Sequence, residues 1–252
     1  MTGVSFASAG SGFDPVTASI FNVIPMKKQL EYFRECKTTI EAKIGKEKTK
    51  NLIRNSAFVV SAGTNDLFMG YHMPFRKETS NITTYLNMLM ETAKEFLQEL
   101  RKEGARNVAL VGLTPIGCVP AVLTLNPGEG GIGERNCNDS LSSAAREFNK
   151  EILKVVKPMK SHNFRILYAD IYKPLENMIK NPSKFGFEKV DVGCCGTGLL
   201  EMTFLCNPLT KICRNPSKYV FFDSAHPTEA TYKQIFKSLR PTIDEAINVF
   251  SH

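Results

Sequence analysis

Residues 57–66 read Ala57-Phe-Val-Val-Ser-Ala62-Gly63-Thr-Asn65-Asp66. The continuous apolar run over Ala57–Ala62 is typical of a buried parallel strand, because such strands are covered on both faces. The run is followed directly by a polar turn. Open α/β sheets bind their ligands at the carboxyl ends of their strands. This stretch therefore predicts an α/β protein with a ligand site near Asn65.

Helical and strand-like segments alternate on both sides of this stretch. The predicted helices are Pro25–Gly45, Lys46–Asn55, Ile82–Lys102, Leu141–Lys160, Asp170–Lys180 and Glu229–Phe250, and the predicted strands are Ala57–Ala62, Val108–Leu113, Phe164–Ala169 and Tyr219–Phe222. The loops 114–120 and 126–133 are too rich in glycine and proline for regular structure. Alternating strands and helices predict a parallel sheet wrapped on both faces. No repeat or linker interrupts the pattern, so a single domain over residues 1–252 is expected.

Composition bounds the kind of partner. The chain has 252 residues, 42% hydrophobic and 23% charged, which suits a folded protein with a substantial core. Its formal net charge is +7, but the lysines are spread over several helical faces and no arginine–aromatic pattern of a single-strand binder occurs. No nucleic-acid partner is expected. No apolar run approaches the ~20 residues that span a bilayer, and no signal peptide is visible at Met1.

Seven cysteines indicate disulfide bonds and an oxidising compartment. Cys118 and Cys137 bracket a Gly/Pro-rich loop and form the predicted pair, while Cys36 is the expected odd thiol. The sequons Asn81-Ile-Thr83 and Asn138-Asp-Ser140 fit a secreted glycoprotein. The other four cysteines lack the C-x-x-C spacing that zinc prefers, so no metal site is expected, and they allow three disulfide pairings: Cys194, Cys195, Cys206 and Cys213.

An acid–base pair is indicated by Tyr219-Val-Phe-Phe-Asp223-Ser-Ala-His226-Pro-Thr-Glu229. On one turn, the Asp223 carboxylate can accept the Nδ1 proton of His226 and leave Nε2 free as a general base. The alternative is that Asp223 caps the helix starting near Pro227 and that His226 is an ordinary surface residue.

Two further polar clusters contain donors for an oxyanion. Residues 3–14, GVSFASAGSGFD, include Gly10 and Gly12, whose backbone N–H groups can approach a ligand closely. Asn65 offers a side-chain amide at the end of the predicted strand. Glycine N–H groups, an amide and an Asp–His pair are the components of acyl transfer. A nucleotide-binding module using Gly10 and Gly12 is a weaker alternative, because the rest of a dinucleotide fingerprint is absent.

Together these segments resemble the GDSL esterase/lipases of the SGNH hydrolase superfamily, in particular the plant branch. The matching segments cover nearly all of the chain in the family's order: GVSFASAGSGFD, SAGTND, GLTPIGCVP, CCGTG and FDSAHPTEA. The resemblance implies a three-layer α/β/α sandwich with a mainly parallel, flavodoxin-like sheet. It implies hydrolysis of a small-molecule or lipid carboxylic ester through an acyl-serine, without a cofactor, by a protein expected to be a monomer. Carried over by position, Gly10 and Asn65 donate to the oxyanion, His226 is the base and Asp223 orients it.

The chain departs from the family in one respect. The Gly-Asp-Ser-Leu block, which follows the first strand and carries the nucleophilic serine, is not present. We therefore expect a sequence truncated at its N-terminus, without its first strand and signal peptide, from an extracellular enzyme, and inactive or nearly so as printed. The alternative is a non-catalytic protein that binds an acyl or carbohydrate ligand.

The remaining serines are poor substitutes for that nucleophile. Asn138-Asp-Ser140-Leu141 resembles the absent motif, but it follows a glycine-rich loop and opens a predicted helix, so Ser140 is expected at a helix N-terminus. Ser8, Ser11 and Ser224 lack the strand-then-turn context of a nucleophile.

Overall fold

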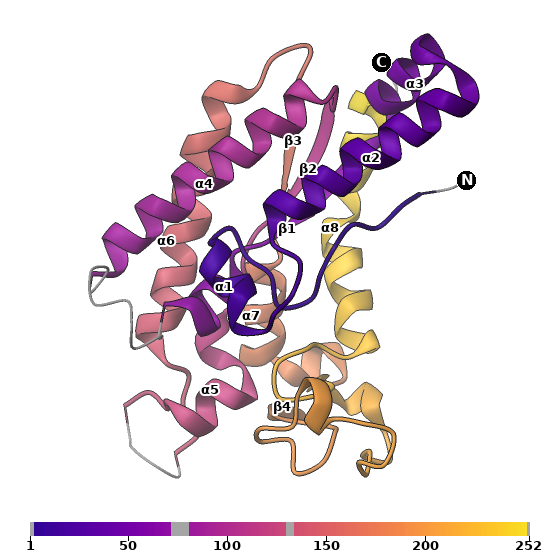
Figure 1. The fold of residues 1–252 in the computed structure, drawn as a ribbon. Helices are drawn as coiled ribbons and strands as arrows, with labels where there is room; N and C mark the ends of the chain where they lie inside the picture. The colour runs from indigo at the N-terminus through magenta and orange to yellow at the C-terminus, as the bar shows by residue number, and fades with distance from the viewer. Residues whose placement is uncertain (1–2, 72–80, 130–133, 251–252) are drawn as a thin grey trace. The chain divides into compact units, whose positions relative to one another are not determined.

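The computed structural model describes residues 3–71, 81–129 and 134–250, and of these the side chains of 249 and 250 are not described. Its helices are α1 (Pro15–Ile20), α2 (Met26–Ile44), α3 (Lys46–Asn55), α4 (Ile82–Lys102), α5 (Pro120–Leu125), α6 (Asp139–Val156), α7 (Tyr172–Lys180) and α8 (Glu229–Phe250). Its strands are β1 (Ala57–Ser61), β2 (Asn107–Val111), β3 (Arg165–Ala169), β4 (Lys189–Gly193) and β5 (Tyr219–Phe221). They form an α/β fold whose strand pairings are all parallel within the described residues (Figure 1). None of the helices in this part of the chain is long and apolar enough to cross a bilayer.

The chain forms two compact units. The first unit contains residues 1–111, 148–169 and 244–252, and the second contains 112–147 and 170–243.

A parallel sheet in the order β1-β2-β3 is the framework of the first unit. Ala57 pairs with Asn107 and Asn107 with Arg165, so the three strands begin at the same level. Their carboxyl ends therefore lie along one edge of this sheet. β1 leads directly into the turn that carries Asn65, as the sequence predicts.

The helices of the first unit end where local sequence dictates. Gly45, with φ +83°, separates α2 from α3 in a backbone conformation that side chains disfavour. The Asn81 side chain accepts the N–H of Thr83 and caps α4. On α4 the fully buried residues recur every fourth position, at Leu89, Ala93 and Leu97.

One expectation about β1 is wrong. The apolar run was expected to be buried on both faces, yet within β1 only Val60 is buried, while the neighbouring Val59 is 72% exposed. Successive side chains of a strand point to opposite faces, and β1 is an edge of the three-stranded sheet. The face of β1 that carries Phe58 packs against Phe33 of α2, and the face that carries Val59 is open to solvent.

The second unit contains β4, β5 and the described disulfides. β5, which the sequence predicts, pairs with β4, which the sequence analysis missed. Cys118–Cys137 is bonded as predicted, and Cys36 is a free thiol. The four clustered cysteines adopt the nested pairing Cys194–Cys213 and Cys195–Cys206.

Two short helices were also missed, and both begin at a proline. α1 follows Asp14, whose side chain accepts the N–H of Val16, and α5 starts at Pro120. α5 falls next to a loop that was expected to be irregular. Residues 130–133 of the predicted glycine-rich tract lie outside the described residues.

Candidate active site

Asp223 and His226 lie side by side just after β5. The N–H of Phe222 donates to the carbonyl of His226 at 2.8 Å and closes the turn between them. Asp223 Oδ1 accepts the backbone N–H groups of Ala225 and His226, at 2.8 and 2.7 Å. Asp223 Oδ2 lies 2.7 Å from His226 Nδ1. One carboxylate oxygen thus shapes the turn and the other orients the imidazole.

The helix-cap alternative for Asp223 is wrong. Helix α8 begins at Glu229, and Thr228 Oγ1 accepts the N–H of Thr231 at 3.2 Å, so Thr228 is the cap. Among the described residues, Asp223 accepts its side-chain hydrogen bonds from the turn that precedes the helix.

Exposure and charge suit the two residues to different tasks. The Asp223 side chain is 9% exposed, and that of His226 is 59% exposed. The hydrogen bond to Asp223 raises the pKa of His226 above its ordinary value, against the opposing effect of burial. Burial alone would raise the pKa of Asp223, but the hydrogen bonds from His226 and Ala225 outweigh it and lower that pKa. The imidazole is therefore a stronger base than a free histidine.

The turn that carries Asp223 is supported by residues to which the sequence analysis gave no role. A Cβ atom at Gly193, the last residue of β4, would lie 2.6 Å from the carbonyl carbon of Asp223 and 2.7 Å from its oxygen. Only glycine allows β4 to approach so closely. The carbonyl of Glu201 accepts the N–H of Ser224 at 2.8 Å. The signal for Gly193 was its position immediately before the cysteine pair Cys194-Cys195.

Glu201 also organises its own loop. Its carboxylate accepts the N–H groups of Thr197, Leu199 and Leu200 at 2.9–3.3 Å, together with the Thr197 hydroxyl. Partial burial opposes ionisation, but these hydrogen bonds lower the pKa of Glu201 to about 2. The loop next to the Asp223 turn is thus built around an ionised carboxylate.

In the first unit, Asn65 and the Gly10 loop lie together. Asn65 Nδ2 donates to the carbonyl of Ser11 at 2.9 Å, which uses one of its two amide hydrogens. Gly10 has φ +87°, a conformation typical of glycine, and a Cβ there would crowd the Phe21 ring at 3.2 Å. The two predicted oxyanion donors therefore flank the same residue, Ser11.

Asp66 holds this loop in place and was missed as a functional candidate. Its carboxylate is fully buried and accepts the N–H groups of Phe13 and Asp14 at 2.8 and 3.1 Å, and the Thr17 hydroxyl at 2.6 Å. Burial raises the pKa of Asp66 to about 6, although these hydrogen bonds oppose the rise. Any side chain at Gly12 would overlap this carboxylate, so the contact with Asp66 requires glycine at position 12.

The candidate serines are occupied or buried. The Ser11 hydroxyl donates to the carbonyl of Ser8 at 2.8 Å and accepts from Gln29. The Ser224 hydroxyl is fully buried and has no hydrogen-bond partner among the described residues, so it is not bonded to His226. Ser140 lies on the first turn of α6, as predicted, and the side chain of Asn138 accepts the N–H of Leu141 there.

Comparison with known proteins identifies the family of this chain. Residues 1–239 match the family of GDSL-like lipases/acylhydrolases. The chain belongs to the GDSL-like lipase/acylhydrolase family. It is 47% identical to one GDSL esterase/lipase of Arabidopsis thaliana, over 99% of this chain and 68% of that protein. Two others from the same plant are 42% and 40% identical, over 92% and 93% of this chain and 58% and 66% of their own lengths. The chain thus spans only 58–68% of the length of these relatives.

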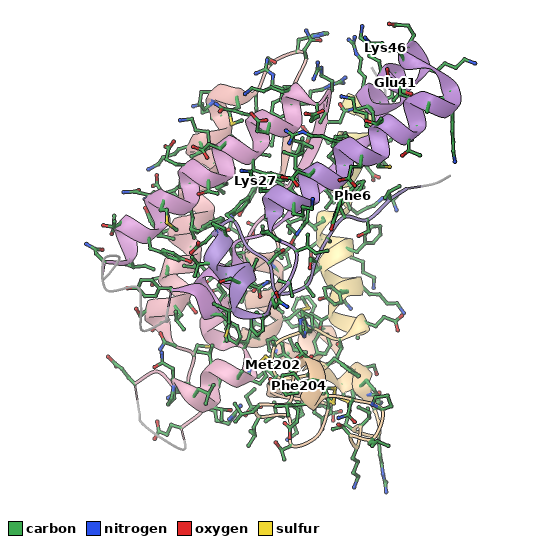
Figure 2. All side chains as sticks on the ribbon, viewed as in Figure 1. Phe6, Lys27, Glu41, Lys46, Met202 and Phe204 are labelled. Carbon is green, nitrogen blue, oxygen red and sulfur yellow. A yellow bond between two sulfur atoms is a disulfide. The ribbon has the colours of Figure 1, made fainter. Side chains whose placement is uncertain are left out.

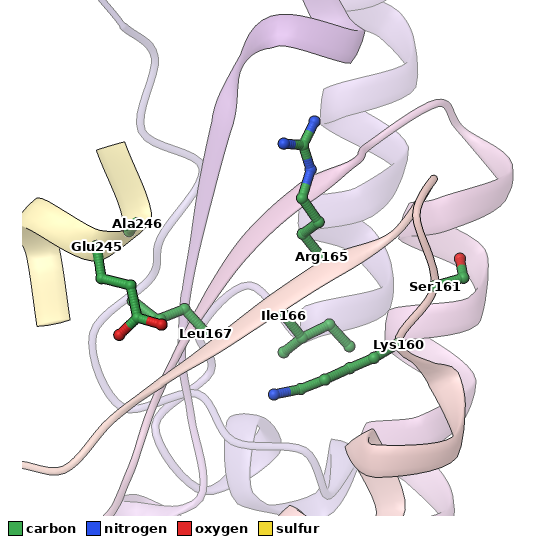
Figure 3. Close-up of a pocket in the computed structure, with 7 residues that line it drawn as sticks. All are labelled: Lys160, Ser161, Arg165, Ile166, Leu167, Glu245 and Ala246. Carbon is green, nitrogen blue, oxygen red and sulfur yellow. The ribbon is translucent and has the colours of Figure 1, made fainter. Parts of the chain in front are cut away.

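The first unit also has a cavity that is lined by none of the predicted site residues. It has a volume of about 370 Å³ and lies in the first unit, between β3 and the end of α8 (Figure 3). Charged and apolar side chains line it together: Lys160, Ser161, Arg165, Ile166, Leu167, Glu245 and Ala246. No histidine is among the residues that line it, so we assign it no part in ester chemistry.

Proposed function

We propose that the protein is a carboxylic ester hydrolase in which His226 is the general base and Asp223 its orienting carboxylate. The observation that supports this most is the 2.7 Å contact between His226 Nδ1 and Asp223 Oδ2. It fixes the Nδ1–H tautomer and leaves Nε2 on an exposed ring, free to accept a proton.

The proposed reaction is acyl transfer. A serine hydroxyl attacks the ester carbon while His226 Nε2 takes its proton, and the carbonyl oxygen becomes an oxyanion. The Gly10 N–H and the second amide hydrogen of Asn65 would donate to that oxyanion. The intermediate collapses as His226 returns the proton to the leaving alcohol. Water then attacks the acyl-serine by the same route, releasing the carboxylic acid and restoring the serine.

The proposed nucleophile is the serine of a Gly-Asp-Ser-Leu block, a run that the 252 residues do not contain. In another serine hydrolase, loss of the nucleophile lowers kcat by about 10⁶-fold. A polypeptide limited to these residues is therefore expected to be inactive or nearly so. A second candidate is a non-catalytic ligand-binding protein, which is favoured by the state of Ser224: its hydroxyl, though close in sequence to His226, is not bonded to it.

An enzyme assay separates these candidates. The assay uses p-nitrophenyl acetate and butyrate and compares two proteins. One is the 252-residue polypeptide, and the other is a chimaera that carries the family's Gly-Asp-Ser-Leu block ahead of residue 1. We expect turnover by the chimaera only, and its loss in His226→Ala but not in the exposed-histidine control His162→Ala. A folded chimaera without turnover would refute the hydrolase proposal, and turnover unaffected by His226→Ala would refute the assigned base.

We further propose an extracellular monomer, glycosylated and active on small or lipid esters. Three disulfides support an oxidising compartment. Asn81 is exposed, whereas Asn138 Nδ2 donates to the carbonyl of Asn126 at 3.1 Å, so Asn81 suits a glycan better. A mobility shift on deglycosylation, absent in Asn81→Gln, tests this assignment; light scattering tests the monomer.

A further inference from the structure

A loop of the second unit carries large apolar side chains on its outside. Residues 202–214, here named the apolar loop, follow β4 and include Met202 and Phe204 (Figure 2). Phe204 is 80% exposed and Leu209 is 96% exposed, and Leu205 and Ile212 are also exposed. Single exposed apolar residues are ordinary on protein surfaces, but four within nine positions make a patch.

Two polar side chains of the apolar loop, Asn207 and Thr210, bond to the loop's own backbone. Asn207 Nδ2 donates to the carbonyl of Phe204, and Asn207 Oδ1 accepts the N–H of Leu209, at 3.1 and 2.9 Å. Thr210 Oγ1 donates to the carbonyl of Leu205 and accepts the N–H of Asn207, both at 3.1 Å. These two side chains thus satisfy backbone groups within the loop, while its large apolar side chains are exposed to solvent.

Two covalent bonds hold this arrangement. Cys206 and Cys213, both within the apolar loop, are bonded to Cys195 and Cys194. The N–H of Gly196 also donates to the carbonyl of Lys211 at 2.9 Å. The shape of the loop is therefore set when the protein folds, and docking it against a partner requires little further loss of conformational entropy.

The charged residues within this part of the sequence are all basic. From Met202 to Phe222 the sequence contains Lys211, Arg214 and Lys218 but no aspartate or glutamate. Lys218 forms an ion pair with Glu188 at 3.0 Å. Lys211 and Arg214 are exposed and beside the patch, which gives it the combination of apolar and basic groups that binds anionic lipid surfaces.

We propose that the apolar loop docks this protein on an anionic phospholipid surface. Phe204 and Leu209 enter the boundary of the acyl chains, and Lys211 and Arg214 contact the phosphate groups. The loop is joined to the turn that carries His226. Cys206 of the loop is bonded to Cys195, and the N–H of Cys195 donates to the carbonyl of Phe222 at 2.8 Å. Docking there brings His226 near the surface at which lipid esters are found. Lipid binding itself requires no turnover, so it stands or fails independently of the proposed function.

Co-flotation with vesicles tests the proposal. The vesicles contain equal parts of ether-linked phosphatidylcholine and phosphatidylglycerol, which have no ester bond to hydrolyse, with ether-linked phosphatidylcholine alone as the neutral comparison. We expect binding to the anionic vesicles that weakens with salt. Phe204→Ser with Leu209→Ser should lower the partition coefficient on the order of 20-fold, because partial burial of each side chain contributes about fivefold. Lys211→Gln with Arg214→Gln should lower it by a similar factor and remove most of the salt dependence.

Matched variants elsewhere control for general effects. Leu125→Ser removes a leucine that is 70% exposed, and Lys48→Gln with Lys50→Gln removes two charges from α3. Both should bind as the unchanged protein does, with all variants checked by circular dichroism and thiol count. The proposal is overturned if the unchanged protein does not bind at low salt, or if the loop variants bind as tightly as the controls. Dimers without vesicle binding, dissociated by Leu209→Ser, would instead assign the patch to a second copy of the chain.

Discussion

Replacing Asp223 by asparagine separates the two tasks of this side chain. The asparagine oxygen can still accept the N–H groups of Ala225 and His226, so the turn should persist. The amide nitrogen would then face His226 Nδ1, which must accept its hydrogen bond. The imidazole proton would move to Nε2, and the atom proposed as the general base would be blocked.

The expected magnitudes follow from this exchange. One charge-assisted hydrogen bond becomes a neutral one, which should cost about 1 kcal/mol of stability. The raised pKa of His226 contributes stability that is present below the ordinary histidine value and lost as pH rises through the folded value. The loss should therefore be larger at about pH 5 than at about pH 8. In a catalytically complete protein, kcat should fall by about 10⁴-fold, as the same exchange does in a serine protease.

Nitrogen-15 NMR of the imidazole measures the tautomer and the pKa without any need for turnover. We expect Nδ1–H in the unchanged protein, Nε2–H in Asp223→Asn, and a lower pKa for His226 in the variant. Asp139→Asn, which alters an exposed carboxylate at the start of α6, should change neither. The reasoning is refuted if Asp223→Asn keeps the Nδ1–H form or leaves the His226 pKa unchanged.

Three further predictions concern the supports of the site. Gly193→Ala should lower the free energy of urea unfolding by about 1–3 kcal/mol, because its Cβ would overlap the backbone of Asp223. Gly3→Ala, with no atom within 4 Å of its Cβ, should leave the stability unchanged. Equal stabilities of the two variants would contradict the packing of Gly193 against Asp223. The lowered pKa of Glu201 contributes stability that is present above the ordinary glutamate pKa and lost as pH falls to about 2. Glu201→Gln should therefore lower the free energy of unfolding by about 1–2 kcal/mol after solvent screening. The variant's stability should also change less with pH below about pH 4.5. The raised pKa of Asp66 acts in the opposite direction, because it favours the protonated side chain in the folded state. Unfolding at a series of pH values should show up to about 3 kcal/mol of stability lost as pH rises from the ordinary aspartate pKa to about 6. Asp66→Asn should abolish this dependence of stability on pH.

Most of the helices could be predicted because local signals set both their position and their ends. Gly45 ends α2, Asn81 caps α4, and the apolar spacing of α4 continues through its last turn. The Asp223–His226 contact was predictable for the same reason, since both residues lie on one turn.

What the sequence did not reveal depends on contacts made far along the chain. β4 has no continuous apolar run and pairs with β5 some 30 residues away, as in Lys189 with Tyr219. The exposure of Val59 depends on whether another element packs on its face of β1, and no local pattern encodes that. The need for glycine at Gly193 likewise exists only once the Asp223 backbone lies against it.

Because of the nested disulfides, the compartment in which the protein is expressed should determine whether the second unit folds correctly. Glu201, whose carbonyl accepts the N–H of Ser224 in the Asp223–His226 turn, lies inside the loop that Cys194 and Cys213 close. Material made in a reducing cytosol could therefore keep the helix content of the first unit while the turn of Asp223 and His226 lacks its support from Glu201. A failed esterase assay on such material would reflect the redox history of the sample, so a thiol count should precede any conclusion about its chemistry.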